Sequence, residues 1–283
     1  MPARIIDGKA IAAQVRAEVG EKVAELFAPP GLAAVMVGDD PASHVYVGQK
    51  RKMAAEVGIV SFDNDLPATI SQVELLDRVQ VLNVNPSVHG ILVQLPLPEH
   101  IDQITVQEAI DPHKDVDGLH PENQGLLALG RPRFIPATPA GVVEIMERAG
   151  VEVEGKRVVV VGRSALVGRP LSILLSLKAD GLNATVTLCH TGTKDIAAYT
   201  REAEIVIVAA GKRNTLTADM VAPGATVIDV GTNRGDDGKL VGDVDFATVS
   251  EVAGAITPVP GGVGPMTVAM LLMNTVRAAE GLT

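Results

Sequence analysis

Between residues 157 and 230, short runs rich in valine and isoleucine alternate with segments of helical periodicity. Apolar runs bounded by turn residues are typical of strands buried on both faces of a parallel sheet. Strands that alternate with helices indicate right-handed β-α-β units. We therefore expect a parallel-sheet α/β domain here, with strands at Arg157–Val161, Thr185–Cys189, Ile205–Ala209 and Thr226–Val230 and helices at Pro170–Lys178 and Asp195–Glu202.

The N-terminal half also mixes helices and strands. Ser71 and Glu74 form a capping-box pattern at the start of one helix, and Thr138-Pro139 places an N-cap before a first-turn proline at another. Residues 111–136 lose periodicity, which predicts a long functional loop with a short helical turn. Helices are expected at Lys9–Phe27, Ser43–Val57, Ser71–Leu82, Thr138–Ala149 and Met266–Ala279, and strands at Leu32–Val37, Ile59–Leu66 and His89–Gln94.

These patterns predict two α/β domains. Residues 1–140 are expected to form an α/β catalytic domain, against which a C-terminal helix at 264–283 packs back. Residues 141–263 are expected to form a Rossmann-like domain with a parallel sheet. The length of 283 residues is enough for two ordinary domains, each with its own core.

The composition argues against several classes of function. A net charge of −10 and an aromatic content of 2% argue against a nucleic-acid or anionic-membrane surface, because such surfaces need basic stripes and stacking rings. The single cysteine, Cys189, forbids an internal disulfide and a cysteine-cluster metal site, and the six histidines are scattered. We therefore expect no metal, no membrane span and, since the N-terminus lacks a signal-peptide core, a cytoplasmic protein.

A glycine turn joins the expected strand Arg157–Val161 to the following helix. Its sequence is Gly162-Arg163-Ser164-Ala165-Leu166-Val167-Gly168-Arg169-Pro170, so Ser164 stands where the GxGxxG pattern has its second glycine. Backbone N–H groups and a helix N-terminus at such a turn can bind phosphate. Taken alone, the motif fits a plain turn between a strand and a helix equally well.

The end of the next strand favours NADP over NAD as the cofactor. A free ribose 2′-hydroxyl usually meets an acidic residue there, about 20 residues or more after the glycines. Here the strand ends in Cys189-His190-Thr191, without a carboxylate. Arg163 in the turn and the Thr191 hydroxyl can bind a 2′-phosphate, which a carboxylate would repel. His190 is equally compatible with a plain surface residue.

Tyr46 and Lys50 are four residues apart on the expected helix 43–57 and therefore share one helix face. A tyrosine can orient a neighbouring lysine, and burial lowers the pKa of a lysine toward that of a useful base. A lone YxxxK match is more often a solvated helix face. Short-chain dehydrogenases use the same pattern after the nucleotide turn, whereas here it lies more than a hundred residues before the turn, which disfavours that family.

Two further segments carry polar side chains of interest. Gln94, in Val93-Gln94-Leu95-Pro96-Leu97-Pro98, follows an expected strand at the end where α/β ligand crevices open. The run Lys114-Asp115-Val116-Asp117-Gly118-Leu119-His120 places two carboxylates in the irregular stretch. One carboxylate can accept two parallel N–H bonds from an amino-heterocycle. Neither segment alone distinguishes a site from a solvated loop.

Together, these segments resemble the bifunctional methylenetetrahydrofolate dehydrogenase/methenyltetrahydrofolate cyclohydrolase family, the FolD proteins. The matching blocks run nearly from end to end: Ile6–Lys9, Val37–Pro41 through Tyr46 and Lys50, Val93–Pro98, Lys114–His120, Thr138-Pro139, Gly162–Pro170 and Pro258–Thr267. The resemblance implies NADP-dependent oxidation of 5,10-methylenetetrahydrofolate, hydrolysis of the methenyl product to 10-formyltetrahydrofolate, and a place in one-carbon metabolism and purine biosynthesis. It also implies one folate cleft shared by two domains, and a homodimer.

The resemblance also implies roles for single residues. Lys50 is the main catalytic residue of the family pattern, and Gln94 positions it. Tyr46 stacks on or steers the folate, and Asp117 holds the pterin ring. Further substrate positions are Pro260, Gly261 and Gly262, and the cofactor positions are Gly162, Arg163, Ser164, Thr191 and Thr232.

Three cofactor positions depart from the pattern of many relatives. Thr191 stands in place of a serine, Thr232 in place of an isoleucine, and the loop Gly211–Asn214 lacks a common proline. The first change keeps the hydroxyl, and the second falls where the backbone does most of the contacting. The departures bear on cofactor affinity and preference and leave the reaction class unchanged.

Three alternatives stay open at this stage. The first is a monofunctional NAD(P)-dependent dehydrogenase on the same scaffold, against which the presence of both Lys50 and Gln94 argues. The second is a non-catalytic folate- or nucleotide-binding regulator, which would bind its ligand tightly without turnover. The third is a dehydrogenase of an unrelated hydroxy acid, which would leave the polar residues of the N-terminal half unexplained.

Overall fold

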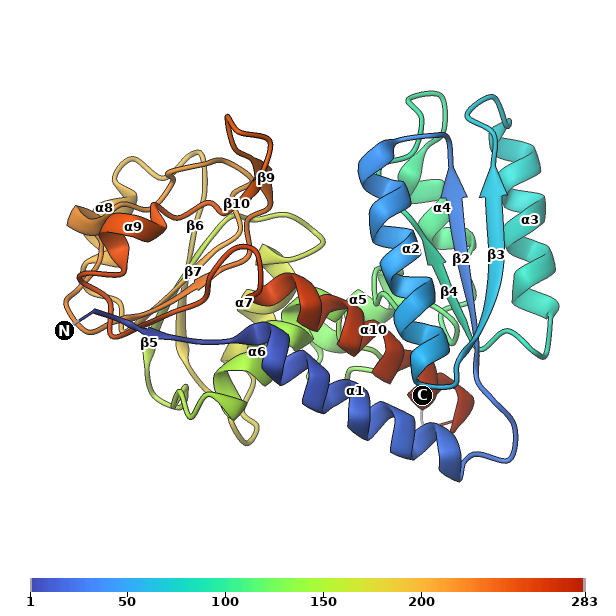
Figure 1. Cartoon of the computed structure of the whole chain (residues 1–283), viewed down its shortest axis with the longest axis horizontal. Helices are drawn as coiled ribbons and strands as arrows, with labels where there is room; N and C mark the ends of the chain where they lie inside the picture. Colours follow the sequence, from blue (N-terminus) through green and yellow to red (C-terminus); the bar gives the residue numbers. More distant parts are fainter. Residues whose placement is uncertain (1, 282–283) are drawn as a thin grey trace. The chain divides into compact units, whose positions relative to one another are not determined.

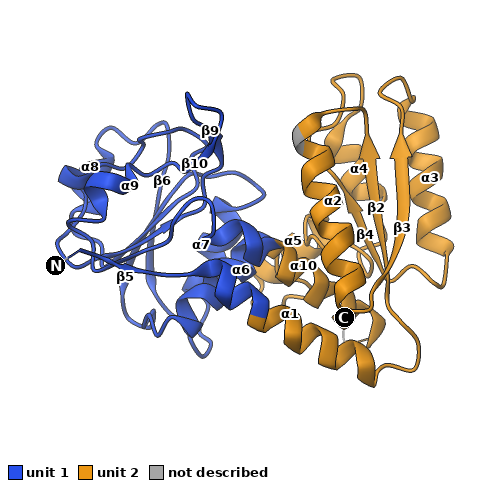
Figure 2. Cartoon of the chain, viewed as in Figure 1, with its two compact units in different colours: residues 1–13, 138–267 blue, residues 14–137, 268–283 orange. Residues whose placement is uncertain are grey.

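The computed structural model describes residues 2–281, apart from the side chain of Ala42, and divides into two compact units. Unit 1 holds the residues up to Ala13 and Thr138–Thr267, and unit 2 holds Gln14–Ala137 and the chain from Val268 on (Figure 2). Helices α1 (Gly8–Glu25) and α10 (Val263–Ala279) each contribute residues to both units. The expected two-domain α/β fold, with one parallel Rossmann-like sheet, is confirmed.

The two units differ from the expected domain limits at the chain ends. The residues up to Ala13 group with the C-terminal half, whereas we expected residues 1–140 to stay together. The chain from Val268 on groups with unit 2. The limits 1–140, 141–263 and 264–283 of the functional domains stay a prediction, and residues 282–283 lie outside the described part of the chain.

Unit 1 is built on a six-stranded sheet in which every pairing is parallel (Figure 1). The four strands expected from the sequence are present, each within one residue of its predicted bounds. Two more, of two residues each, extend the sheet at one side and were not expected, because so short a strand carries no periodicity. The order across the sheet is β1 (Arg4–Ile5), β11 (Ala255–Ile256), β8 (Thr226–Asp229), β7 (Ile205–Val208), β5 (Arg157–Val161), β6 (Thr185–Cys189).

Helices cover this sheet because its strands are apolar on both faces. Helix α7 (Gly168–Ser176) buries Leu171, Leu174 and Leu175 and packs on β5 and β6. Alternate strand residues face a second apolar cluster that includes Val249 of helix α9 (Phe246–Val249). The remaining elements of unit 1 are α6 (Ala137–Arg148), α8 (Ile196–Thr200), the 3-10 helix η1 (Ala218–Met220) and the antiparallel pair β9 (Asn233–Arg234) and β10 (Leu240–Val241).

Unit 2 is built on a three-stranded parallel sheet with the order β3 (Val60–Leu66), β2 (Gly31–Val37), β4 (Gly90–Val93). Every residue of the central strand β2 is buried. Its odd-numbered residues pack in a cluster with α3 (Gln72–Val84) and α4 (Gln103–Ala109), whereas Ala34 and Met36 pack against Val47 of α2 (Pro41–Glu56). The period of two along β2 therefore places α2 on one face of the sheet and α3 and α4 on the other.

Several helix boundaries correct the sequence-based predictions. Helix α2 begins at Pro41, and its N-cap is Asp40, whose carboxylate accepts the Ser43 N–H at 2.7 Å; Ser43 itself is not the cap. Helix α6 likewise begins at Ala137, so Thr138 is already helical. The capping box of Ser71 and Glu74 is confirmed.

The segment between β4 and α6 holds more helix than expected. Helix α4 was not predicted, although Asp102 caps it by accepting the N–H groups of Ile104 and Thr105. The short helical turn expected in residues 111–136 is the eight-residue helix α5 (Pro121–Ala128). In the part of the chain that the structure describes, no helix is long and apolar enough to cross a membrane.

Candidate active site

Two of the predicted catalytic residues of unit 2, Gln94 and Lys50, are positioned by its parallel sheet. Gln94 follows β4 directly, and its N–H donates to Val35 O at 2.8 Å, which continues the pairing with β2. Lys50 lies on α2, the helix that follows β2 and packs against it. Helical side chains lean toward the helix N-terminus, so the Lys50 side chain is directed back toward the strand ends. Ligand crevices of α/β sheets open at this edge.

Lys50 and Gln94 are in direct contact. The Lys50 Nζ donates a hydrogen bond to Gln94 Oε1 at 3.0 Å, across 44 residues of sequence. An ammonium has no acceptor, so the amide oxygen of Gln94 must face Lys50. The other side of the same amide donates from Nε2 to Leu95 O at 2.6 Å, which holds this orientation. Gln94 therefore fixes the position of the lysine nitrogen through a neutral group.

Burial controls the charge of Lys50 and of Asp117. Desolvation lowers the pKa of Lys50, and the nearby Asp117 carboxylate opposes that shift. In the same way burial raises the pKa of Asp117, against the opposing charge of Lys50. The two groups thus share an environment of low polarity in which a neutral lysine amine is accessible, as a general base requires.

The loop that carries Asp117 is part of the sheet edge. Residues 114–116 run beside β4: Ile91 N–H donates to Lys114 O at 2.7 Å, and Ile91 forms a parallel bridge with Asp115. Asp117 therefore follows a strand-like segment in the same way that Gln94 follows β4. Gly118 then turns the chain with a φ of 70°, where an added Cβ would press on the backbone of Pro136. Only glycine fits this turn without strain.

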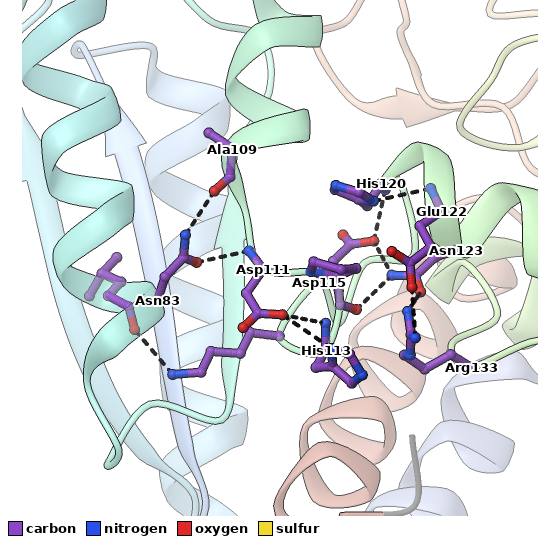
Figure 3. A network of polar contacts seen from close by, with 12 residues as sticks. Asn83, Ala109, Asp111, His113, Asp115, His120, Glu122, Asn123 and Arg133 are labelled. Carbon is purple, nitrogen blue, oxygen red and sulfur yellow. Dashed lines mark hydrogen bonds and ion pairs between the residues drawn. The ribbon is translucent and has the colours of Figure 1, made fainter.

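A buried polar network holds the loop that carries Asp117 (Figure 3). The Asp115 carboxylate is 2% exposed and accepts the His120 N–H at 2.8 Å and the Asn123 side-chain amide at 2.7 Å. Asn123, fully buried, accepts in turn from Arg133 at 2.9 Å. From the other side Asn274 of α10 donates to Val116 O at 2.8 Å. The backbone on both sides of Asp117 is fixed by these bonds.

The sequence motifs did not mark this network as functional. Asp115 stands in the segment that we singled out, but Asn123, Arg133 and Asn274 carried no signal of their own. Their common property is that a polar side chain is buried and bonded to a loop. Such a group is recognisable only after folding, because burial is what distinguishes it.

Replacing Asp115 by Asn is expected to flatten the dependence of stability on pH. Burial raises the pKa of Asp115 to about 7, and the hydrogen bonds from Asn123 and the loop backbone oppose this shift only in part. Between its ordinary pKa of 3.8 and about 7, the folded state therefore holds a proton that the unfolded state has lost. This contribution stabilises the fold at low pH and is lost as the pH rises through about 7.

Urea unfolding of wild type and Asp115→Asn, at pH values from about 5 to about 8, measures the effect. In wild type the free energy of unfolding should fall by up to roughly 1.4 kcal/mol per pH unit as the pH rises toward ~7, and the variant should lack this slope. Asp77→Asn removes an exposed carboxylate on α3 and serves as the control. Parallel pH curves for wild type and Asp115→Asn would contradict the proposed titration.

Tyr46 lies one helical turn before Lys50 on α2, so the two side chains share a face as expected. Its side chain is 37% exposed, and within residues 2–281 its hydroxyl has no hydrogen-bond partner. The structure thus does not bond Tyr46 to Lys50, to Gln94 or to Asp117. An exposed aromatic ring beside a buried amine is suited to stacking on a flat ligand.

The glycine turn of unit 1 has the geometry of a phosphate-binding site. Gly162 has a φ of 120°, and an added Cβ would collide with Ala209 O at the end of β7. An added Cβ on Gly168 would collide with the Gly162 carbonyl, so both positions require glycine. Helix α7 starts here without a side-chain cap. Arg169 N–H donates to Ser164 O at 3.1 Å and Pro170 has no N–H, so Gly168 N–H is the group of the first turn that can bind an anion.

The position of this turn in the sheet fits a dinucleotide. β6 and β7 flank β5 on opposite sides, so the chain reverses its direction of travel at the carboxyl end of β5. Such a switch point is where doubly wound sheets bind dinucleotides. Arg163 is exposed, with no ion pair or hydrogen bond to another described residue, and the Ser164 hydroxyl accepts the Val167 N–H at 3.2 Å. The residues present therefore fit the cofactor.

Thr191 and Thr232 stand at two other strand ends of the same sheet. Thr191 follows β6, the neighbour of β5, and Gly162 N–H donates to Cys189 O at 2.8 Å. Thr232 follows β8, and both threonines are exposed. The turn that includes Thr191 holds His190, whose Nδ1 accepts the Gly192 N–H at 3.0 Å, and no carboxylate.

The predicted substrate positions Pro260, Gly261 and Gly262 belong to unit 1 and contact the N-terminal Ile6–Lys9 motif. The Lys9 N–H donates to Gly261 O at 2.9 Å, and a Cβ on Gly8 would collide with the Gly262 backbone. Two motifs more than 250 residues apart in the sequence thus form one backbone assembly. In the described part of the chain, no group of three or more His, Cys, Asp or Glu side chains is arranged to hold a metal ion.

Comparisons with known proteins agree with the resemblance found in the sequence. The family description "Tetrahydrofolate dehydrogenase/cyclohydrolase, catalytic domain" matches residues 6–117, and its "NAD(P)-binding domain" matches residues 136–282. The "Bifunctional protein FolD" of Burkholderia thailandensis is 57% identical over 283 residues, which cover 99% of this chain and 98% of that protein.

Solved structures give the same result. The bifunctional enzyme FolD of Campylobacter jejuni is 48% identical, with a TM-score of 0.95 and coverage of 99% of this chain and 100% of the other. The FolD of Trypanosoma brucei, solved with NADP cofactor and inhibitor, is 41% identical, with a TM-score of 0.93 and coverage of 100% and 99%. The chain belongs to the tetrahydrofolate dehydrogenase/cyclohydrolase family.

Proposed function

We propose that this chain oxidises 5,10-methylenetetrahydrofolate to the 5,10-methenyl form with NADP and then hydrolyses that product to 10-formyltetrahydrofolate. The observation that carries the proposal is the contact of Lys50 with Gln94 at 3.0 Å beside Asp117, in an environment that lowers the pKa of the lysine. A dehydrogenase alone has no need of such a base. The relatives named above, bifunctional by description, support both activities.

In the oxidation, the one-carbon bridge between two folate nitrogens loses a hydride. A nitrogen lone pair stabilises the cation that forms, so orientation of the substrate matters more than a strong base. NADP, when bound, accepts the hydride. In this proposal Asp117 holds the pterin by accepting two N–H bonds, and Tyr46 stacks on its flat ring. Pro260, Gly261 and Gly262 supply further backbone contacts to the substrate in this proposal.

In the hydrolysis, a water adds to the cationic carbon, and one proton must leave that water. Lys50, held by Gln94 and with its pKa lowered by burial, accepts this proton. The bond from the carbon to one folate nitrogen then breaks, and that nitrogen takes a proton back from the lysine. The added hydroxyl loses its remaining proton to solvent as the formyl C=O forms. The formyl group stays on the other nitrogen, and the net reaction releases the single positive charge of the substrate as a proton.

The cofactor residues follow from the geometry of the glycine turn. Gly162 and the uncapped start of α7 face the pyrophosphate, and Ser164 lies in the same turn. Arg163 and Thr191 bind the 2′-phosphate, since neither turn places a carboxylate there. Thr232 contacts the cofactor from the end of β8. The NADP-bound relative supports this choice of cofactor.

A coupled assay with purified chain tests the function. Methylenetetrahydrofolate is supplied with NADP or with NAD, and the formation of reduced cofactor and the decay of the methenyl form are followed together. We expect faster reduction with NADP, and methenyl decay faster than in a protein-free control. Reduction without catalysed decay would indicate a monofunctional dehydrogenase, and binding without either signal would indicate a regulator.

The family resemblance also supports three broader statements. We propose that the chain acts as a homodimer, in the cytoplasm, in the one-carbon metabolism that feeds purine biosynthesis. We further propose that the catalytic and NADP-binding domains have the predicted limits 1–140 and 141–263. Light scattering of the full chain measures its mass in solution, and a monomer at micromolar concentration would contradict the dimer.

A further inference from the structure

Two buried aspartates, Asp229 and Asp243, lie at the carboxyl edge of the unit 1 sheet. Asp229 is the last residue of β8 and Asp243 follows β10, and neither is more than 3% exposed. The Asp229 carboxylate accepts three backbone N–H groups, from Gly231 at 2.9 Å and from Asp243 and Val244 at 3.0 Å each. One carboxylate therefore ties the loop after β8 to the segment after β10.

Asp243 extends this link to a third segment. Its Oδ2 accepts the N–H groups of Ala210 at 2.7 Å and Gly211 at 2.8 Å, in the loop after β7. Its Oδ1 accepts the side-chain amide of Asn233 at 2.8 Å. We call Asp229 and Asp243 the aspartate bracket, because together they hold the loops after β7 and β8 against the segment after β10.

The backbone is shaped to admit these carboxylates. A Cβ on Gly231 would collide with the Asp243 carboxyl group, and a Cβ on Gly242 would collide with the Asp229 carboxyl group. Both glycines are buried. The close approach leaves no room for water to replace the hydrogen bonds. The bracket is therefore a rigid part of the fold.

Burial changes the titration of Asp229, one of the two carboxyl groups of the bracket. Burial, with a contribution from Asp243, raises the pKa of Asp229 to about 6, and the backbone N–H groups oppose the shift. Most Asp229 side chains are then ionised at pH 7. Hydrogen bonds that end on a carboxylate are stronger than those between neutral groups.

The loops that the bracket holds are those of the cofactor site. Thr232 lies between Gly231, bonded to Asp229, and Asn233, bonded to Asp243. Gly162 of the glycine turn packs on the Ala209 carbonyl, next to Ala210, whose N–H is bonded to Asp243. The bracket thus holds the loops after β7 and β8 directly, and it supports the glycine turn after β5 through the packing of Gly162 on Ala209. We expect neither carboxylate to contact a phosphate of the cofactor, because the two negative charges would repel each other.

We propose that Asp243, supported by Asp229, is a positioning residue for the nicotinamide cofactor: it pre-organises the loops after β7 and β8 against the glycine turn. This inference rests on the proposed NADP site. It assigns cofactor affinity to a buried pair of carboxyl groups that does not contact the cofactor. Loops held in the binding conformation before the ligand arrives cost less to order on binding.

The variant Asp243→Asn separates positioning from folding. The new amide has one acceptor oxygen. If that oxygen keeps the hydrogen bonds from the Ala210 and Gly211 N–H groups, the NH2 group of the new side chain faces the NH2 group of Asn233. The loop after β8 is then released. We expect the Kd for NADP, measured by calorimetry on the full chain, to rise roughly 10- to 100-fold. The rate of methenyl hydrolysis, which needs no NADP, should stay within about twofold.

Two further variants sharpen the test. Asp245→Asn changes a neighbouring carboxylate whose one side-chain partner among residues 2–281 is Thr248, and it should leave the Kd for NADP unchanged. The double variant Asp243→Asn/Asn233→Asp restores a donor–acceptor pair at the contact and should recover part of the lost affinity. If Asp243→Asn does not fold, Asn233→Asp alone places a carboxylate against Asp243 and should raise the Kd by itself.

The outcomes are distinct. An unchanged Kd for NADP in folded Asp243→Asn overturns the proposed role of the bracket. So does a double variant that binds NADP no more tightly than the single variant with the higher Kd. Equal losses of NADP binding and methenyl hydrolysis also overturn it, since they indicate general damage. A wild-type chain that binds NADP without turnover refutes the proposed function instead, and the Kd comparison still decides the role of Asp243.

Discussion

Lys50→Met is expected to lower the rate of methenyltetrahydrofolate hydrolysis by roughly 10²- to 10⁴-fold, the range for loss of a general base. Methionine keeps the length and the apolar stem of lysine but cannot accept a proton. The amine that it removes is the one held by Gln94 at 3.0 Å, with its pKa lowered by burial. Methionine suits a buried site at least as well as lysine, so the variant should fold.

The measurement is methenyl decay in the absence of NADP, with purified wild type and variant. Lys52→Met is the matched control, because Lys52 lies on the same helix with its side chain 77% exposed, near Glu56. It should retain the wild-type rate. Hydrolysis by Lys50→Met at a near-normal rate would refute the assignment of Lys50 as the base.

Arg163→Ala is expected to raise the KM for NADP by roughly 10- to 100-fold while changing the KM for NAD little, as for the loss of a hydrogen bond to a charged group. Only NADP carries the 2′-phosphate that Arg163 is proposed to bind. In the free chain Arg163 is exposed and bonded to no other described residue, so its loss should not disturb the fold.

Initial rates of the oxidation with each cofactor give the two KM values. Arg157→Ala is the control, since Arg157 begins β5 at the end opposite to the glycine turn and pairs with Glu204 at 3.7 Å. It should leave the preference for NADP unchanged. Equal increases for NADP and NAD in Arg163→Ala would count against a contact with the 2′-phosphate.

The strands could be predicted because burial on both faces leaves a mark in the sequence. Arg157–Val161 and Thr185–Cys189 match the structure residue for residue. The strands β1 and β11 could not be predicted, because two residues show no period. They belong to the sheet only through parallel pairing with each other and with β8, which links the two ends of the sequence.

Helix starts show where local signals compete. Asp40 and Ser43 are both good N-cap residues, and Pro41 suits the first helical position after Asp40. The structure uses Asp40, and the Ser43 N–H is the group that it caps. Two adequate caps three residues apart cannot be ranked from sequence alone, because the choice depends on how the preceding turn leaves β2.

The candidate site was predictable in part. Parallel strands bring their carboxyl ends to one edge, and the family resemblance singled out Lys50, Gln94 and Asp117. The bond between Lys50 and Gln94 still joins residues 44 apart, and nothing in either segment determines its length. The supports of the site, such as Asn123 beneath Asp115 or Asp243 beneath the loop of Thr232, become visible only through burial.

The proposed hydrolysis depends most on the protonation of the Lys50 amine, and the titration of this amine tests it directly. Lysines labelled at Cε are followed by NMR as the pH is raised, and the Lys50 signal is assigned by its absence from Lys50→Met. We expect it to titrate below the ordinary lysine value of 10.5, since burial disfavours the charged form. A Lys50 signal that titrates at or above 10.5 would contradict a neutral amine acting as the base.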